Sequence, residues 1–162
     1  MEQLYLDCDG VLADFDRSAT DILGCAPGEF EERHGAGKFW AALKQDANFY
    51  RQLKLLPDAV LLIESVRHLK PIILTGYPPS WKDSVTQKME WVRRTFGQLQ
   101  PVIVCESKHK SLFCRPGDVL IDDRPHYRGL WESAGGRWIH HTSAEDSITQ
   151  LAQLSIWTNP PK

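Results

Sequence analysis

Three short apolar runs in this sequence each end in polar or acidic residues, and this pattern limits the folds that the chain can adopt. Runs of three or four apolar residues are typical of strands in a buried parallel sheet. The three endings are Asp7-Cys8-Asp9, Thr75-Gly76 and Asp122-Asp123. Because the carboxyl ends of parallel strands meet at one edge of a sheet, we expect these residues to lie close together.

The first ending has the residues of a catalytic site. Asp7 and Asp9 are two positions apart, so at the end of a strand their side chains point to the same side. Gly10 then allows the chain to turn away sharply. Two neighbouring carboxylates repel each other unless a cation or a reaction uses them. One could act as a nucleophile and the other as a proton donor, with Mg²⁺ suppressing their repulsion.

The rest of the sequence alternates between apolar runs and segments with helical spacing. Residues 57–69 place apolar side chains three and four positions apart, and a helix is predicted over 80–96 with Ser80 as its N-cap. Further strands are predicted at 101–105 and 137–140. This alternation predicts an α/β fold, namely a three-layer, Rossmann-like parallel sheet with right-handed crossovers.

These motifs resemble those of the haloacid dehalogenase (HAD) superfamily of phosphatases. Asp7-Cys8-Asp9-Gly10-Val11 resembles the first motif, Thr75-Gly76 the second and Asp122-Asp123 the fourth. The segments 9–15 and 120–125 narrow the resemblance to the 5′(3′)-deoxyribonucleotidases and their small bacterial relatives. The resemblance covers roughly residues 4 to 141. It implies a Mg²⁺-dependent phosphatase that works through an aspartyl phosphate, with a nucleoside monophosphate as substrate.

The resemblance also implies a small helical cap inserted after the first strand. Helical spacing at 14–23, 29–34 and 38–45, without a convincing strand, is consistent with this. We therefore expect a HAD-like core formed by residues 1–15 and 56–157, a cap over 16–55 and a frayed tail over 158–162.

The resemblance assigns a role to each motif residue. Asp7 would be the nucleophile, and Asp9 would protonate the leaving oxygen and later deprotonate water. Asp7, Asp9 and Asp122 would bind Mg²⁺, with Asp9 using its backbone carbonyl in the family pattern, while Asp123 orients its neighbours. The phosphate-binding residues would be Thr75, Gly76 and a lysine, for which Lys110 is favoured over Lys108.

Substrate recognition is less constrained by the sequence. Aromatic residues that would wall the cleft or stack on a base are Phe15, Phe39, Trp40 and Tyr77, although each of them also suits core packing. Phosphatase action on another small phosphate ester, or on a nucleic-acid 3′ end, stays open. Two alternatives of another class are a phosphoacceptor receiver domain and a catalytically silent binding protein.

The composition excludes several other classes. A formal net charge of −2 gives no reason to expect a nucleic-acid partner, and no apolar stretch approaches the length of a membrane span. The four cysteines lack Cys-x-x-Cys spacing and are interpreted as reduced thiols, which predicts a cytoplasmic protein. The expected partner is a small phosphate ester, and a homodimer is compatible with the sequence.

Overall fold

A computed structural model describes residues 2–154 and contains one sheet of five parallel strands. The strands follow the order β3-β2-β1-β4-β5. Their bounds are β1 (Leu4–Leu6), β2 (Ile72–Gly76), β3 (Val102–Cys105), β4 (Val119–Asp122) and β5 (Arg137–His140). The apolar runs therefore form strands, as predicted, because a parallel sheet buries both of its faces.

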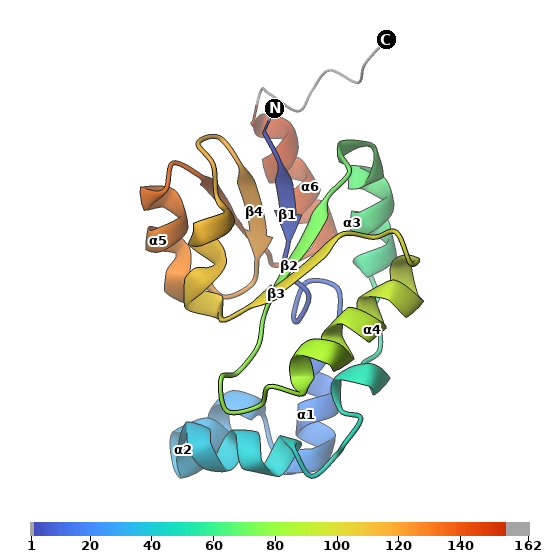
Figure 1. Ribbon diagram of the computed structural model, residues 1–162, viewed down its shortest axis with the longest axis vertical. Helices are drawn as coiled ribbons and strands as arrows, with labels where there is room; N and C mark the ends of the chain where they lie inside the picture. The colour runs from blue at the N-terminus through green and yellow to red at the C-terminus, as the bar shows by residue number, and fades with distance from the viewer. Residues whose placement is uncertain (1, 155–162) are drawn as a thin grey trace.

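Helices cover both faces of the sheet, so the predicted three-layer α/β architecture is confirmed (Figure 1). The helices α3 (Ala59–Val66), α4 (Ser84–Phe96) and α6 (Ala144–Gln153) contribute to the larger core, together with Leu4 and Leu6 of β1. On the other face, Tyr5 packs edge-to-face on Trp131 of α5 (Arg128–Ser133), with ring centroids 5.5 Å apart. The 3₁₀ helices are η1 (Tyr50–Gln52), η2 (Arg67–Leu69), η3 (Ser107–Phe113) and η4 (Pro125–Tyr127).

The order in which strands are added to the sheet reverses between β1 and β4. From β1 the chain adds β2 and β3 on one side, and then it crosses to add β4 and β5 on the other. Leu6 pairs with Ile121, and the backbone N–H of Asp7 donates to the carbonyl of Ile121 at 2.9 Å. Asp7 and Asp122 consequently lie next to each other at the point where open α/β sheets place their ligand sites.

A helical insertion follows β1 and lies beyond the carboxyl ends of the strands (Figure 1). It contains α1 (Phe15–Leu23), α2 (Pro27–Leu43) and η1. Its two ends are paired, since the N–H of Asp14 donates to Lys54 O at 2.8 Å and the N–H of Leu56 donates to Leu12 O at 2.9 Å. The insertion therefore leaves and rejoins the core at one place.

Some predicted boundaries differ from the structure. The two helices expected at 29–34 and 38–45 both lie within α2, and the non-helical backbone of Gly35, with φ of 80° and ψ of 159°, separates them; the first begins at Pro27 and the second ends at Leu43. The helix α4 begins at Ser84 and not at Ser80, because residues 77–83 first make turns in which Trp81 donates to Pro78 O at 2.8 Å. The last turn of the helix predicted over 57–69 has the 3₁₀ geometry of η2.

The predicted tail, 158–162, lies outside the described residues, as does the end of the predicted core at 155–157. Among residues 2–154, no helix has the length and apolar character that crossing a membrane requires.

Candidate active site

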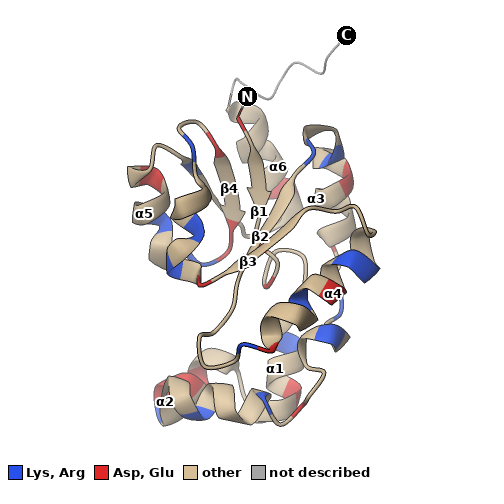
Figure 2. Cartoon of the chain, viewed as in Figure 1, with Lys and Arg blue, Asp and Glu red and all other residues tan. Residues whose placement is uncertain are grey.

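Lys110 lies between two carboxylates at the carboxyl ends of β1 and β4. Its Nζ is 3.0 Å from Asp7 Oδ1 and 2.7 Å from Asp122 Oδ2, and all three side chains are buried. Figure 2 shows acidic residues at the end of β4 and basic residues in the neighbouring segment. Burial lowers the pKa of Lys110, but the charges of Asp7 and Asp122 outweigh it and raise that pKa above its ordinary value. The lysine is therefore held in its charged form.

Lys108, the alternative phosphate lysine, pairs with a different carboxylate. Its Nζ is 3.0 Å from Glu106 Oε2, and its side chain is 54% exposed. The two lysines differ because η3 is a 3₁₀ helix, in which residues three apart share a face and residues two apart do not. The structure thus brings Lys110, and not Lys108, to Asp7.

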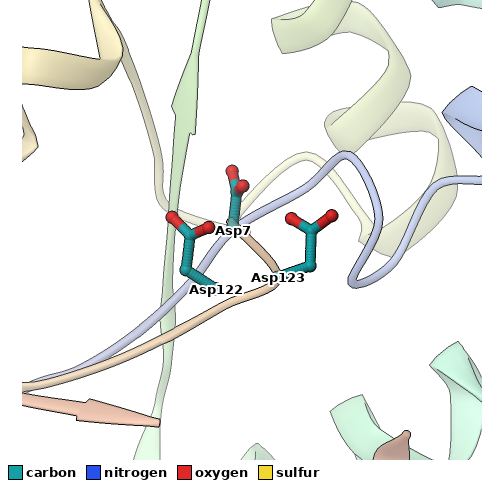
Figure 3. Close-up of side chains that lie close together, drawn as sticks. All are labelled: Asp7, Asp122 and Asp123. Carbon is teal, nitrogen blue, oxygen red and sulfur yellow. The ribbon is translucent and has the colours of Figure 1, made fainter. Parts of the chain in front are cut away.

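Three carboxylates in this region could share one cation. Asp7, Asp122 and Asp123 each offer an oxygen atom, and these atoms lie within 4.8 Å of one another (Figure 3). Burial and the charge of Asp7 raise the pKa of Asp122 to about 6, although Lys110 opposes this shift. Burial and the charges of Asp7 and Asp122 raise the pKa of Asp123 to about 7. The cluster therefore carries more negative charge than its protein cations offset, and its hard oxygen donors suit Mg²⁺.

Gly10 makes room for the third of these carboxylates. Its φ is +77°, and a Cβ at this position would lie 2.1 Å from Asp123 Oδ2. Both the left-handed backbone and the close approach of Asp123 therefore require glycine. The left-handed backbone at Gly10 forms the sharp turn expected after Asp9.

The carboxylate of Asp9 does not join the cluster, because it forms an ion pair with Lys88 of α4. Lys88 also donates to Thr75 Oγ1 at 3.2 Å, and its Nζ lies 4.4 Å from the centre of the Tyr50 ring. Burial and the charge of Asp7 raise the pKa of Asp9, while Lys88 lowers it, and the net shift is upward. An upward shift favours the protonated form of Asp9.

Lys88 was missed by the sequence analysis, although the sequence contains a signal for it. The buried face of α4 consists of Ser84, Gln87, Lys88, Trp91 and Val92, at spacings of three and four. A lysine on the core-facing side of an amphipathic helix is rare unless it has a charged partner. That position would have indicated a buried ion pair, but not which acid completes it.

A cavity of about 350 Å³ adjoins Asp7 and Asp9, and aromatic side chains form part of its wall. Phe15, Trp40 and Tyr77 line it, together with Tyr50. Phe39 is placed differently: it is 3% exposed and packs in the core of the insertion, with its ring centroid 4.7 Å from that of Trp40. Phe39 therefore supports the wall and does not line the cavity.

A second cavity, of about 480 Å³, lies on the side of Asp122 and Lys110. Five residues line both cavities: Asp7, Ser107, Lys108, Arg124 and Tyr127. Arg124 Nε lies 4.0 Å from Asp123 Oδ2, and its guanidinium carbon lies 5.9 Å from the centre of the Phe15 ring. Asp7 is thus reached from two directions. Thr75, by contrast, is fully buried beside Lys88.

Comparisons with known proteins identify the family of this chain. Residues 28–159 match the family model described as "5' nucleotidase, deoxy (Pyrimidine), cytosolic type C protein". The chain belongs to this family. It is 31% identical over 157 residues to a protein of Bordetella pertussis provisionally named 5′(3′)-deoxyribonucleotidase, covering 85% of this chain and 80% of the relative. A relative from Bordetella bronchiseptica with the same provisional name is 30% identical, with the same coverage.

Solved structures place this nucleotidase-family chain in the HAD fold. A hydrolase from Streptococcus pneumoniae TIGR4 matches with a TM-score of 0.56 at 16% identity, covering 96% of this chain and 98% of that one. L-2-haloacid dehalogenase from Xanthobacter autotrophicus matches with a TM-score of 0.57 at 17% identity, covering 94% and 83%. The resemblance to HAD-superfamily hydrolases and deoxyribonucleotidases is therefore confirmed. Membership in a hydrolase family also removes the receiver-domain alternative.

Proposed function

We propose that this chain is a Mg²⁺-dependent phosphomonoesterase that forms an aspartyl phosphate on Asp7 and acts on deoxynucleoside monophosphates. The observation that carries the proposal is the position of Lys110 between Asp7 and Asp122, at the switch point of the sheet. A phosphate ester placed there would meet a carboxylate nucleophile and a buried cation together. Phosphoryl transfer needs both, because negative charge spreads over the transferred oxygens.

In the proposed reaction, Asp7 attacks phosphorus while the bond to the leaving oxygen breaks. Asp9 gives its proton to that oxygen, so the alcohol leaves neutral. In the second step a water molecule attacks the phosphoryl group, Asp9 takes a proton from it, and the bond to Asp7 breaks. Burial of Asp9 and the charge of Asp7 support this role, since both raise the pKa of Asp9. Lys88 would hold the Asp9 carboxylate in place between the two steps.

The donor set fits the expected Mg²⁺. Asp7 and Asp122 would hold the ion, with the Asp9 carbonyl as the family pattern implies, and Asp123 lies close enough to contribute or to orient the others. Bound there, Mg²⁺ would offset the repulsion between the carboxylates and the substrate phosphate. Lys110 and the backbone N–H of Gly76 would hold the remaining phosphate oxygens, with Thr75 behind them.

The proposed substrate class rests on the family and on the cavity beside Asp7 and Asp9. Flat aromatic walls suit a nucleobase, and Phe15, Trp40, Tyr50 and Tyr77 supply them. The family description and the names of the Bordetella relatives support a deoxynucleotide, and a pyrimidine one in particular. The same description supports the cytoplasmic location that the sequence predicts.

The test is phosphate release from a panel of deoxyribonucleoside and ribonucleoside monophosphates and sugar phosphates, measured with Mg²⁺ and with EDTA. The proposal expects Mg²⁺-dependent release that favours deoxynucleotides and falls by at least about 1,000-fold in Asp7→Asn, because the nucleophile is lost. Asp21→Asn makes the same change at an exposed position of α1 and should match the wild type.

Other results would contradict one part of the proposal and leave the rest. Release from sugar phosphates alone would keep the mechanism and discard the substrate class. Full activity in EDTA would remove the role of Mg²⁺. Release that survives in Asp7→Asn would remove the aspartyl phosphate. A folded protein that releases phosphate from none of these esters would favour a catalytically silent member of the family.

A further inference from the structure

We infer that Ser107 supplies a phosphate-binding hydroxyl, and that residue 76 is glycine in order to leave room for it. The inference deepens the proposed function and rests on it for the identity of the anion. Neither the sequence motifs nor the family resemblance assigns a role to Ser107. Its position does, because Ser107 lines both of the cavities that meet at Asp7.

Gly76 and Ser107 are held against each other by the sheet. Gly76 ends β2 and pairs with Cys105 of β3, and the N–H of Tyr77 donates to the carbonyl of Cys105 at 2.9 Å. Two residues after Cys105 the helix η3 begins, with Ser107 as its first residue. A Cβ at position 76 would lie 2.1 Å from Ser107 Oγ and 3.2 Å from Ser107 Cβ.

The backbone at position 76 does not itself require glycine. Its φ lies outside the left-handed range, in contrast to the φ of +77° at Gly10. The three heavy atoms nearest to a Cβ there would all belong to Ser107. The glycine at 76 is therefore explained by the space that the Ser107 side chain occupies.

The hydroxyl of Ser107 faces the same side as the phosphate lysine. In a 3₁₀ helix, residues three apart are eclipsed, so Ser107 and Lys110 share one face of η3. Both line the second cavity together with Asp7. Among residues 2–154, no hydrogen bond joins Ser107 Oγ to another protein atom, and the residue is partly exposed. By comparison, the Thr75 hydroxyl is fully buried and accepts from Lys88.

Ser107 therefore offers the site a hydroxyl donor that both cavities can reach. A phosphate held by Lys110 beside Asp7 has several oxygens to satisfy, and a hydroxyl on the same helical face can donate to one of them. Hydrogen bonds from neutral donors to an anion are stronger than those to neutral acceptors. The Ser107 hydroxyl would thus add affinity for the phosphate group, whatever the rest of the substrate.

The test is the dissociation constant of inorganic phosphate in the presence of Mg²⁺, measured by calorimetry. Ser107→Ala should weaken binding by about tenfold, as expected for one hydrogen bond to a charged group. Ser133→Ala removes a hydroxyl from an exposed position of α5 that lines neither cavity, and it should leave the constant within about twofold of the wild type. Thermal unfolding of both variants checks that the protein stays folded.

A second variant tests the role of Gly76. Gly76→Ala keeps the backbone N–H but forces the Ser107 hydroxyl out of its position, so it should also weaken phosphate by about tenfold. If both changes act through this hydroxyl, the double variant should bind no more weakly than Gly76→Ala alone. Additive losses of about 100-fold in the double variant would contradict that link.

The inference is overturned if Ser107→Ala binds phosphate like the wild type, if Ser133→Ala weakens binding equally, or if the wild type binds no phosphate. These outcomes are separate from the proposed function. If the protein hydrolyses nucleotides but Ser107→Ala leaves phosphate binding unchanged, only this inference is contradicted. If the protein hydrolyses no ester but binds phosphate through Ser107, only the proposed function is contradicted.

Discussion

The two lysines of the site, Lys110 and Lys88, pair with different carboxylates and come from different kinds of structure. Lys110 comes from η3 and meets two carboxylates at strand ends. Lys88 comes from the middle of α4 and meets one carboxylate, where that helix packs against the returning end of the insertion. The Lys110 half of the site, formed by Lys110, Asp7, Asp122 and Asp123, has surplus negative charge. The Lys88 half, formed by Lys88 and Asp9, pairs one cation with one carboxylate.

This difference should affect metal binding and stability in different ways. Surplus carboxylates around Lys110 oppose folding unless a cation joins them, which is a cost that a metal-dependent reaction can use. The Lys88–Asp9 pair is internally neutral, and it is braced by Tyr50 and Thr75. We therefore expect changes in the Lys110 half to affect mainly activity and metal binding. A change at Lys88 should also lower the free energy of unfolding, while Asp9 itself is needed for the proposed reaction.

The largest effect is expected from Lys110→Met. Removal of the buried charge should lower kcat/KM for the best substrate by about 100- to 1,000-fold, because the transferred phosphate loses its protein cation. Steady-state kinetics at saturating Mg²⁺ would measure this. Lys108→Met is the comparison. Lys108 also lines both cavities, but its exposed side chain pairs with Glu106 and not with Asp7, so kcat/KM should change by less than about fivefold. Equal losses in the two variants would abolish the distinction between these lysines.

The next effect is expected from Lys88→Met. Asp9 would then be left without its cation in a largely buried place, which should reduce the free energy of unfolding by roughly 2–3 kcal/mol. Urea denaturation would measure the change. Asp9→Asn in the same chain should restore most of the loss, because no charge remains unpaired. If the double variant is less stable than Lys88→Met, the ion pair is not the source of the effect.

The smallest effect concerns the surplus charge around Lys110 and depends on pH. The pKa of Asp123 is raised to about 7, so its stabilising contribution is present at low pH and is lost as the pH rises through that value. In metal-free protein at pH 8, Asp123→Asn should therefore raise the free energy of unfolding by on the order of 1–2 kcal/mol, because the side chain is only partly exposed.

Two measurements check that assignment. Near pH 4 the advantage of Asp123→Asn should vanish, since Asp123 is then protonated in the folded protein. Asp21→Asn, an exposed change in α1, should show no such pH dependence. An Asp123→Asn variant that is less stable than the wild type at pH 8 would mean that the Lys110 half carries no excess charge.

The sequence predicted the strand-end half of the site well, and the physical reason is topology. Apolar runs fix β1, β2 and β4, and the parallel register then places Asp7 beside Asp122 without any knowledge of side-chain packing. Lys110 could be favoured from its distance to Asp122 along the chain. The choice between Lys110 and Lys108 depends on the 3₁₀ geometry of η3, which the sequence did not specify.

The Lys88 pair and the cavity walls could not be predicted, because they depend on contacts between segments that are distant in sequence. The ion pair of Lys88 with Asp9 joins residues 79 positions apart, and the space opposite Gly76 is defined by Ser107. The burial of Phe39 beneath Trp40 likewise follows from how the insertion folds on itself. Spacing indicates which face of a helix is buried, but it does not identify the neighbours.

The insertion starts and ends in adjacent hydrogen-bonded positions, where Ala13 bridges Leu55. A segment with such closely spaced ends can gain, lose or exchange residues without shifting the strands beneath it. Phe15 and Trp40 lie on this segment, whereas Asp7, Lys110 and Asp122 do not. Selection on what the cavity admits and selection on the charged centre can therefore act on separate stretches of the gene, so that new preferences evolve on an unchanged reaction core.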